Sequence, residues 1–252
     1  MRLAAGIVVG ACILLASADN YPALARSGAG HLEVTVNIDA SLQAVRQVAG
    51  SDRRAPPLFG METIPVAGEV AAKWRAVEAD IKSEQEVLAR CSSQEACPTV
   101  ARNMLDIVAE GAGRTGRARV GLINRAVDLA ITPSSDEAQW GVADHWSPPF
   151  ETLQSHRGDC EDYAIVKYVA LLQAGLSQDD VKIIILRNLL PNEDHAAVAA
   201  RVDGQWLILD NRHLALVPDM KMVRSIPEFV LGEDGAWRFI PSNRTGQRPS
   251  AG

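Results

Sequence analysis

The stretch HRGDCEDYAIVKYVALLQAG, residues 156–175, places one cysteine, Cys160, among three acids at the start of an apolar segment. The glycine and aspartate before Cys160 are typical of a helix start, with Asp159 near the N-cap, so we expect Cys160 in the first helical turn. Unpaired backbone N–H groups and the positive end of the helix dipole lie there. Both stabilise a nucleophilic thiolate, and the same N–H groups can form an oxyanion hole. Asp159, Glu161 and Asp162 oppose the thiolate, so a bound cation or a charged imidazole has to compensate for them.

A cysteine nucleophile needs a base, and the base needs a group that orients it. The histidines that could serve are His31, His145, His156, His195 and His213. The stretch RVDGQW holds Asp-Gly at 203–204, which is typical of a two-residue type I′ turn between two strands. If these two residues form the loop, Val202 pairs with Gln205. His195 and Asp210 then lie on one face of the sheet as diagonal neighbours, about 7–8 Å apart in the backbone.

The N-terminal sequence is typical of a secretory signal peptide. Arg2 is followed by an apolar run, residues 3–16, and then by two small-x-small sites that end at Ala18 and Ala25. The run is shorter than the ~20 residues that a membrane-spanning helix needs. We therefore expect cleavage after Ala25 or Ala18 and a mature chain that does not span the membrane. A membrane anchor and a lipoprotein modified at Cys12 are the weaker alternatives.

The cysteines have different expected fates. Cys12 leaves with the signal peptide. Cys91 and Cys97 are close in sequence, and an oxidising compartment favours a disulfide between them. Cys160 is then left alone, and an unpaired thiol in an exported protein is either buried and inert or kept for chemistry.

The register of the hairpin decides whether the histidine and the acid meet. A bulged turn shifts the pairing by one residue and places His195 and Asp210 on opposite faces. Taken alone, the two are more typical of an ordinary cross-strand polar pair. Beside an unpaired cysteine at a helix start, they favour a triad of Cys160, His195 and Asp210.

Hydrophobic spacing predicts the elements that position these residues. Helices are expected at about 68–90, 98–110 and 117–131, and a buried helix from Cys160 through Leu172 to Gly175. The inward residues expected of the second and third helices are Val100, Met104, Leu105 and Val108, and Val120, Leu122, Ile123, Val127 and Ile131. Residues 132–151 read as a long loop. Strands are expected at 31–38, 181–188, 195–202, 205–211 and near 237–240. Helices followed by mostly antiparallel strands predict one α+β domain.

Composition and charge exclude some classes of function. The chain has 252 residues, of which 47% are hydrophobic and 22% charged, as in an ordinary globular protein. Its net charge of −6 argues against a nucleic-acid binder, which usually carries a basic face.

Two stretches, HWSPPFETLQSHRGDCEDYAIVKYVALLQAG and DHAAVAARVDGQWLILDN, resemble the bacterial transglutaminase-like cysteine proteinase family. The resemblance runs from about Trp74 to Trp237 and is strongest from Trp140 to Asn211. It rests on the block GDCEDYA with a downstream histidine and the tripeptide LDN. The family implies a papain/transglutaminase-like core, in which N-terminal helices and a nucleophile helix pack on a mostly antiparallel sheet.

The resemblance also implies roles for particular residues. Cys160 corresponds to the nucleophile, His195 to the base that later protonates the leaving amine, and Asp210 to the group that orients the histidine. Trp146 corresponds to a wall of the cleft, with plain core packing as the alternative.

Calcium dependence is a further implication of the resemblance. The acids beside the cysteine, Asp159, Glu161 and Asp162, correspond to calcium ligands. Calcium prefers six to eight oxygen ligands, so loop carbonyls or further acids have to help; these acids are Asp136, Asp144 and Glu151. The alternative for the acidic group is helix capping together with solvated charge.

These inferences predict a periplasmic, calcium-dependent cysteine endopeptidase that cleaves a large surface adhesin or another exported protein. The family further implies an inner-membrane receptor for cyclic di-GMP as a partner. Two alternatives remain: a transglutaminase or other acyltransferase with the same triad, and a non-catalytic, calcium-responsive binding protein in adhesin signalling. The expected segments are a signal peptide at 1–25, an N-terminal extension with a possible strand at 26–67, a peptidase domain at 68–241 and a flexible tail at 242–252.

Overall fold

The computed structural model describes residues 56–91, 97–233 and 235–242. The predicted signal peptide, the predicted strand at 31–38 and the tail from residue 243 lie outside the described residues. Within them the α-helices are α2 (Glu69–Cys91), α3 (Thr99–Glu110), α4 (Gly116–Ala130), α5 (Asp136–Trp140), α6 (Pro149–Ser155) and α7 (Cys160–Gln173). Short 3₁₀ helices are η1 (Leu58–Gly60), η2 (Gln178–Asp180) and η3 (Asp219–Lys221). No helix in these ranges is both long enough and apolar enough to cross a membrane.

The three helices predicted before residue 132 are confirmed as α2, α3 and α4, but two of their inward faces differ from the prediction. The buried residues of α3 are Ala101, Met104 and Ile107. Val100, Leu105 and Val108 are only half-buried. In α4, Leu122 is half-buried and the polar Asn124 is fully buried instead. The faces are rotated because α3 packs against several helices at once, α2, α4, α6 and α7, rather than against one surface.

The predicted loop at 132–151 is wrong in part, because it contains a short strand and two helix starts. Strand β2 (Thr132–Pro133) opens it. Helix α5 begins after Ser135, whose hydroxyl accepts the Ala138 N–H at 3.4 Å, and it ends at Gly141, where φ is +72°. Helix α6 begins at Pro149, a position where proline starts a helix without losing a hydrogen bond.

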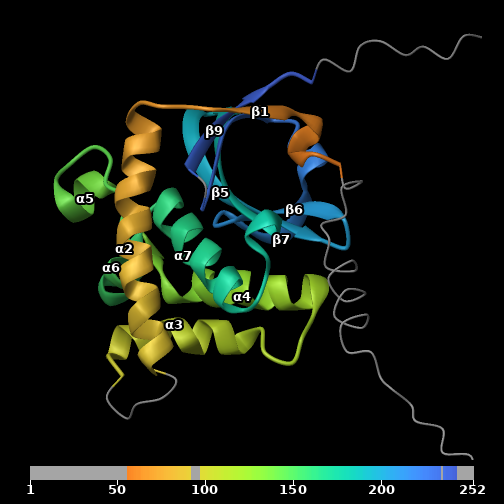
Figure 1. Cartoon of the computed structure of the whole chain (residues 1–252). Coiled ribbons are helices and arrows are strands. Elements are labelled where there is room, and N and C mark those ends of the chain that lie inside the picture. Colours follow the sequence, from red (N-terminus) through yellow and green to blue (C-terminus); the bar gives the residue numbers. More distant parts are fainter. Residues whose placement is uncertain (1–55, 92–96, 234, 243–252) are drawn as a thin grey trace, which may run out of the picture. The chain divides into compact units, whose positions relative to one another are not determined.

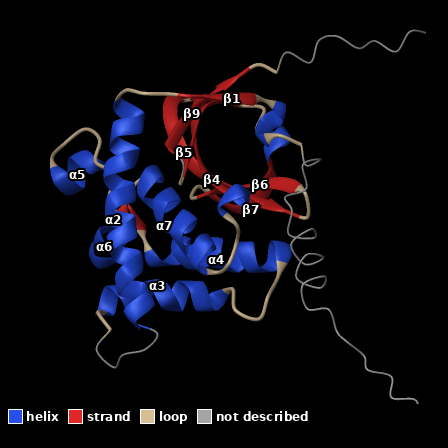
Figure 2. Cartoon of the chain, in the orientation of Figure 1, coloured by secondary structure: helices blue, strands red, loops and turns tan. Residues whose placement is uncertain are grey.

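In the described residues the main sheet has seven strands in the order β1-β9-β8-β4-β5-β6-β7, and every neighbouring pair is antiparallel. Its strands are β1 (Glu62–Pro65), β4 (Val181–Leu189), β5 (Asn192–Val202), β6 (Gln205–Asp210), β7 (His213–Pro218), β8 (Ser225–Gly232) and β9 (Gly235–Ile240). The α+β prediction is confirmed, whereas β1, β7 and β8 were not predicted. Figure 2 shows the helices on one side and the curving strands on the other.

The hairpin between β5 and β6 has the register predicted from its turn. Asp203 and Gly204 have φ values of +51° and +76°, as a type I′ turn requires. Val202 pairs with Gln205, and the same register continues to Val198 opposite Leu209.

Helix α7 is the central element of the fold. It packs against β4 and β5 on one side and against α3, α4 and α6 on the others (Figure 1). Every residue from Asp162 to Leu171 is therefore buried, as expected of a helix that is apolar on nearly all sides. Trp74 of α2 supports it: its ring lies 5.7 Å from that of Tyr168, and its indole N–H donates to the Gly232 carbonyl at 2.8 Å.

Candidate active site

Cys160 is the first residue of α7, and Asp159 is its N-cap, as the sequence predicts. The segment before it is held by β3 (Arg157–Gly158), which pairs in parallel with β2 so that Gly158 lies opposite Pro133. A Cβ atom on Gly158 would lie 2.6 Å from the side chain of Asp162. Glycine is therefore required where this strand turns into the helix, and the close approach fixes the start of α7.

His195 of β5 and Asp210 of β6 meet across the hairpin. The distance between Nε2 of His195 and Oδ1 of Asp210 is 3.0 Å, and both residues are buried. The same Oδ1 accepts the Arg212 N–H at 2.9 Å. Burial alone would raise the pKa of Asp210, but the hydrogen bond and charge of His195, together with the Arg212 N–H, lower it below its ordinary value.

The hydrogen bond to Asp210 decides which nitrogen of the His195 ring donates. An ionised carboxylate only accepts hydrogen bonds, so Nε2 of the ring carries the proton. Nδ1 is then the ring nitrogen with a lone pair, and it is buried without a hydrogen-bond partner in the described part of the chain. The ring of His195 thus has its free nitrogen on the side away from Asp210, the arrangement that a histidine base oriented by an acid requires.

Cys160, His195 and Trp146 line the same cavity, which has a volume of about 390 Å³. The Cys160 S–H donates to Oε2 of Glu161 at 3.0 Å. Burial and the charge of Glu161 raise the pKa of the Cys160 thiol, while a hydrogen bond from the Ala196 N–H opposes them. Burial first, and the neighbouring acids second, therefore favour the protonated thiol. A proton acceptor such as Nδ1 of His195, or a cation at the acids, is needed to free the thiolate.

Three acids gather beside the cysteine and form what we call the acidic cluster: Asp136, Asp159 and Glu161. Each offers a carboxylate oxygen, and these oxygens lie within 4.8 Å of one another. Oδ1 of Asp159 is buried without a hydrogen-bond partner in the described part of the chain, and burial and the charge of Glu161 raise the pKa of Asp159 to about 9. A buried carboxylate oxygen that accepts no hydrogen bond and lies among other acids fits a site for a hard divalent cation. Calcium prefers six to eight oxygen ligands, and the acidic cluster provides three of them.

Asp162, which the family resemblance places among the calcium ligands, lies outside the acidic cluster. Its carboxylate accepts the Ser147 N–H at 2.9 Å and the Asp159 N–H at 3.2 Å. Burial raises its pKa to about 7, although both N–H groups act in the opposite direction. These hydrogen bonds favour a structural role for Asp162, which ties the 141–148 segment to the start of α7.

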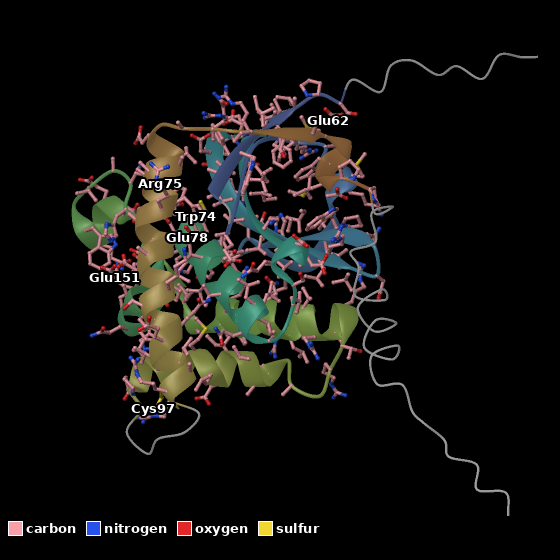
Figure 3. The ribbon with its side chains drawn as sticks, viewed as in Figure 1. Glu62, Trp74, Arg75, Glu78, Cys97 and Glu151 are labelled. Atoms are coloured by element: carbon pink, nitrogen blue, oxygen red, sulfur yellow. A yellow bond between two sulfur atoms is a disulfide. The ribbon has the colours of Figure 1, made fainter. Side chains whose placement is uncertain are left out.

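Of the three further acids expected to help bind calcium, Asp136 belongs to the acidic cluster, whereas the other two contact basic side chains. Asp144 forms an ion pair with Lys73, and Glu151 lies 3.5 Å from the His145 ring. Asp136 reaches the cluster because the β2–β3 pair brings the start of α5 beside the start of α7. The disulfide between Cys91 and Cys97 lies at the end of α2, where Figure 3 places Cys97 far from the labelled Trp74.

The sequence reasoning missed a group of polar side chains enclosed between α4 and α7. Lys167 of α7 forms an ion pair with Asp128 of α4 at 2.7 Å, and their side chains are 1% and 8% exposed. Asn124, one turn before Asp128, is fully buried, and neither atom of its amide has a hydrogen-bond partner in the described ranges. A lysine within the apolar run AIVKYVALL was the available signal.

The pattern of the bacterial transglutaminase-like cysteine proteinases (BTLCP) matches residues 90–222, which is more than half of the chain and includes Cys160, His195 and Asp210. The chain belongs to this family. No curated protein matches it significantly.

Solved structures similar to this BTLCP member include LapG from Legionella pneumophila. LapG is 19% identical with a TM-score of 0.50, and the match covers 62% of this chain and 87% of LapG. A calcium-bound form of LapG is 20% identical with a TM-score of 0.50, and its match covers 66% of this chain and 93% of that one. These likenesses show that the BTLCP chain has a LapG-like fold.

Proposed function

We propose that this BTLCP member is a cysteine endopeptidase in which Cys160, His195 and Asp210 form the catalytic triad. The observation that carries the proposal is the 3.0 Å contact between His195 Nε2 and Asp210 Oδ1, in a hairpin whose histidine shares a cavity with Cys160. This contact fixes the tautomer and leaves Nδ1 as the free base.

The chemistry follows from that arrangement. Nδ1 of His195 takes the proton from Sγ of Cys160, and the thiolate attacks the carbonyl carbon of a peptide bond. The C–N bond breaks, the leaving amine takes the proton from His195, and the acyl group stays on sulfur as a thioester. His195 then takes a proton from water as its oxygen attacks the thioester carbonyl carbon. The C–S bond breaks, the carboxylic acid leaves, and His195 returns the proton to the Cys160 thiolate. Asp210 remains ionised throughout and stabilises the imidazolium.

The proposal includes calcium at the acidic cluster. Calcium in LapG supports it, together with the buried Oδ1 of Asp159 that lacks a donor in the described part of the chain. Bound calcium supplies positive charge beside Cys160. Glu161 would then be shared between the cation and the thiol, and its hydrogen bond to Cys160 would weaken.

The proposed setting is the periplasm, and the proposed substrate is a large surface adhesin or another exported protein. The signal-like residues 1–25 and the Cys91–Cys97 disulfide support an oxidising, exported location. An inner-membrane receptor for cyclic di-GMP is the proposed regulator, on the strength of the family resemblance.

The test compares the wild-type chain with Cys160→Ala. Both are incubated with calcium and a preparation of periplasmic and surface proteins, and new peptide termini are identified by mass spectrometry, with an added primary amine in a parallel sample. We expect termini that carry a free carboxylate with the wild type only, at unchanged circular dichroism of the variant. Identical termini with both proteins would refute the triad, and termini that carry the amine would assign an acyltransferase instead.

A further inference from the structure

A second cavity lies on the other side of the His195–Asp210 pair. It has a volume of about 540 Å³ and is formed by the ends of β4 and β6, by β7 and by the connection from η3 to β8. Asp210 lines this cavity, whereas His195 lines the cavity of Cys160. We call it the basic pocket, after the residues that face it: Arg212, His213, Lys221 and Arg224, with Leu190 and Val223.

The charge of the basic pocket is compensated only in part by acids of the described residues. Arg212 forms an ion pair with Glu193 at 2.7 Å. Lys221 and Arg224 are exposed, and no acidic side chain of the described residues pairs with either. Among the described residues, Asp210 is the one acid that lines the pocket, and His195 and the Arg212 N–H occupy its Oδ1. An anionic ligand is therefore favoured here, in a chain whose net charge is −6.

The pocket also exposes apolar surface. Leu190 and Val223 line it and are 83% and 81% exposed. Apolar side chains that gather at one cavity beside arginines, here Arg212 and Arg224, are typical of a surface that binds another polypeptide. A small anion would use the cations and leave these two side chains uncovered.

The cavity of Cys160 has the opposite charge. The acids that line it are Asp144, Asp159, Glu161, Asp194 and Glu228. Asp144 and Asp194 are ion-paired with Lys73 and Arg187, but no lysine or arginine of the described residues lines this cavity itself. An acidic stretch is therefore attracted to the basic pocket rather than to the cavity of Cys160, and the His195–Asp210 hydrogen bond lies between the two.

We propose that the basic pocket is a docking site for an acidic segment of the protein substrate that also carries apolar side chains. The segment lies to one side of the bond that is cut, and the residues next to that bond are neutral or basic. The inference rests on the proposed proteolysis, because it names the class of polypeptide that the cavity of Cys160 receives.

The experiment measures binding to the Cys160→Ala protein, so that cleavage plays no part. A fluorescein-labelled peptide of alternating glutamate and leucine is titrated at low ionic strength, and anisotropy is recorded. Adding Lys221→Glu and Arg224→Glu turns two attractions into repulsions, and we expect binding to weaken roughly tenfold or more. The matched control, Arg75→Glu with Arg114→Glu, makes the same change in net charge at two exposed arginines outside the pocket and should change binding less than about twofold.

Equal weakening by both double variants would overturn the inference, because it would show an effect of net charge alone. Tighter binding of a single-stranded oligonucleotide than of the peptide would also overturn it and assign the pocket to nucleic acid. A wild-type protein that cuts nothing while the peptide still binds in the pocket would refute the proposed proteolysis alone. Cleavage by the wild type with no effect of the pocket variants would refute the docking site alone.

Discussion

The buried ion pair between Lys167 and Asp128 supports the helix that begins at Cys160, and its loss should be among the most destabilising single changes. Burial lowers the pKa of Lys167 and raises that of Asp128, which shows that both charges are taken out of water. Each charge is tolerated because the other lies 2.7 Å away. In Lys167→Met the side chain keeps its unbranched apolar part and loses only the terminal charged atom, but Asp128 is left as a buried charge without its partner.

The expected magnitude follows from this burial. Breaking a buried pair by removing one partner costs about 3–5 kcal/mol. For a domain of this size, 1 kcal/mol corresponds to about 2–4 °C in Tm. The free energy of unfolding of Lys167→Met should therefore fall by about 3–5 kcal/mol and its Tm by roughly 6–20 °C. Combining Lys167→Met with Asp128→Leu removes both charges, and this double variant should recover most of the loss.

Urea denaturation followed by circular dichroism at neutral pH measures these free energies. The control is Glu86→Gln on α2, which removes one charge from the exposed ion pair of Glu86 and Arg90 at 3.9 Å. That change should alter stability by less than about 1 kcal/mol. A loss below about 1 kcal/mol in Lys167→Met, or a double variant equal to the sum of the two single changes, would show that the charges are not coupled.

Three further predictions concern the same half of the molecule. Burial raises the pKa of Glu84 from 4.5 to about 7. Between these two pH values the carboxyl group is protonated in the folded protein and ionised in the unfolded chain. The free energy of unfolding therefore falls as pH rises through this window. Glu84→Gln, which keeps an acceptor for the Phe150 N–H, should reduce the fall in unfolding free energy between pH 5 and 8 by about 1–2 kcal/mol, after discounting for partial exposure. Gly158→Ala places a Cβ atom 2.6 Å from Asp162 and should destabilise the fold by about 1–3 kcal/mol in the same urea assay. Calcium at a hundredfold excess over its Kd should raise Tm by roughly 5–11 °C, measured by scanning calorimetry, and EGTA should reverse the rise.

Each of these predictions has a result that contradicts it. For Glu84, it is an equal pH dependence of the wild type and Glu84→Gln. For Gly158, it is an alanine variant as stable as the wild type, since the strand would then have room for a methyl group. For calcium, it is a Tm that EGTA leaves unchanged, or a calcium effect that survives replacement of the acidic cluster by amides.

Sequence patterns were sufficient to predict the elements whose capping or turn residues agree with the hydrophobic spacing beside them. Helix α7 was predictable because an apolar run begins after a capping aspartate, and the β5–β6 hairpin because Asp-Gly favours the positive φ values of its turn. Strands β1 and β7 were missed because they alternate weakly and are mostly exposed, as their edge positions allow. Helix α6 was missed because Pro148 and Pro149 read as a loop, although the second proline starts a helix.

Residue types and spacing were enough to indicate which residues could do the chemistry: the cysteine at a helix start, and the histidine and aspartate that one turn places on a common face. Only the tertiary structure decided how the acids around them divide. Asp136 lies in the acidic cluster because the pairing of two short strands brings distant loops together. Asp162 lies outside it because its carboxylate oxygens accept hydrogen bonds from backbone N–H groups. Lys167 and Asp128 likewise become partners only when α4 packs on α7. The physical reason is that turns and caps are set by neighbours in sequence, whereas burial and charge depend on every group that folding brings within a few ångströms.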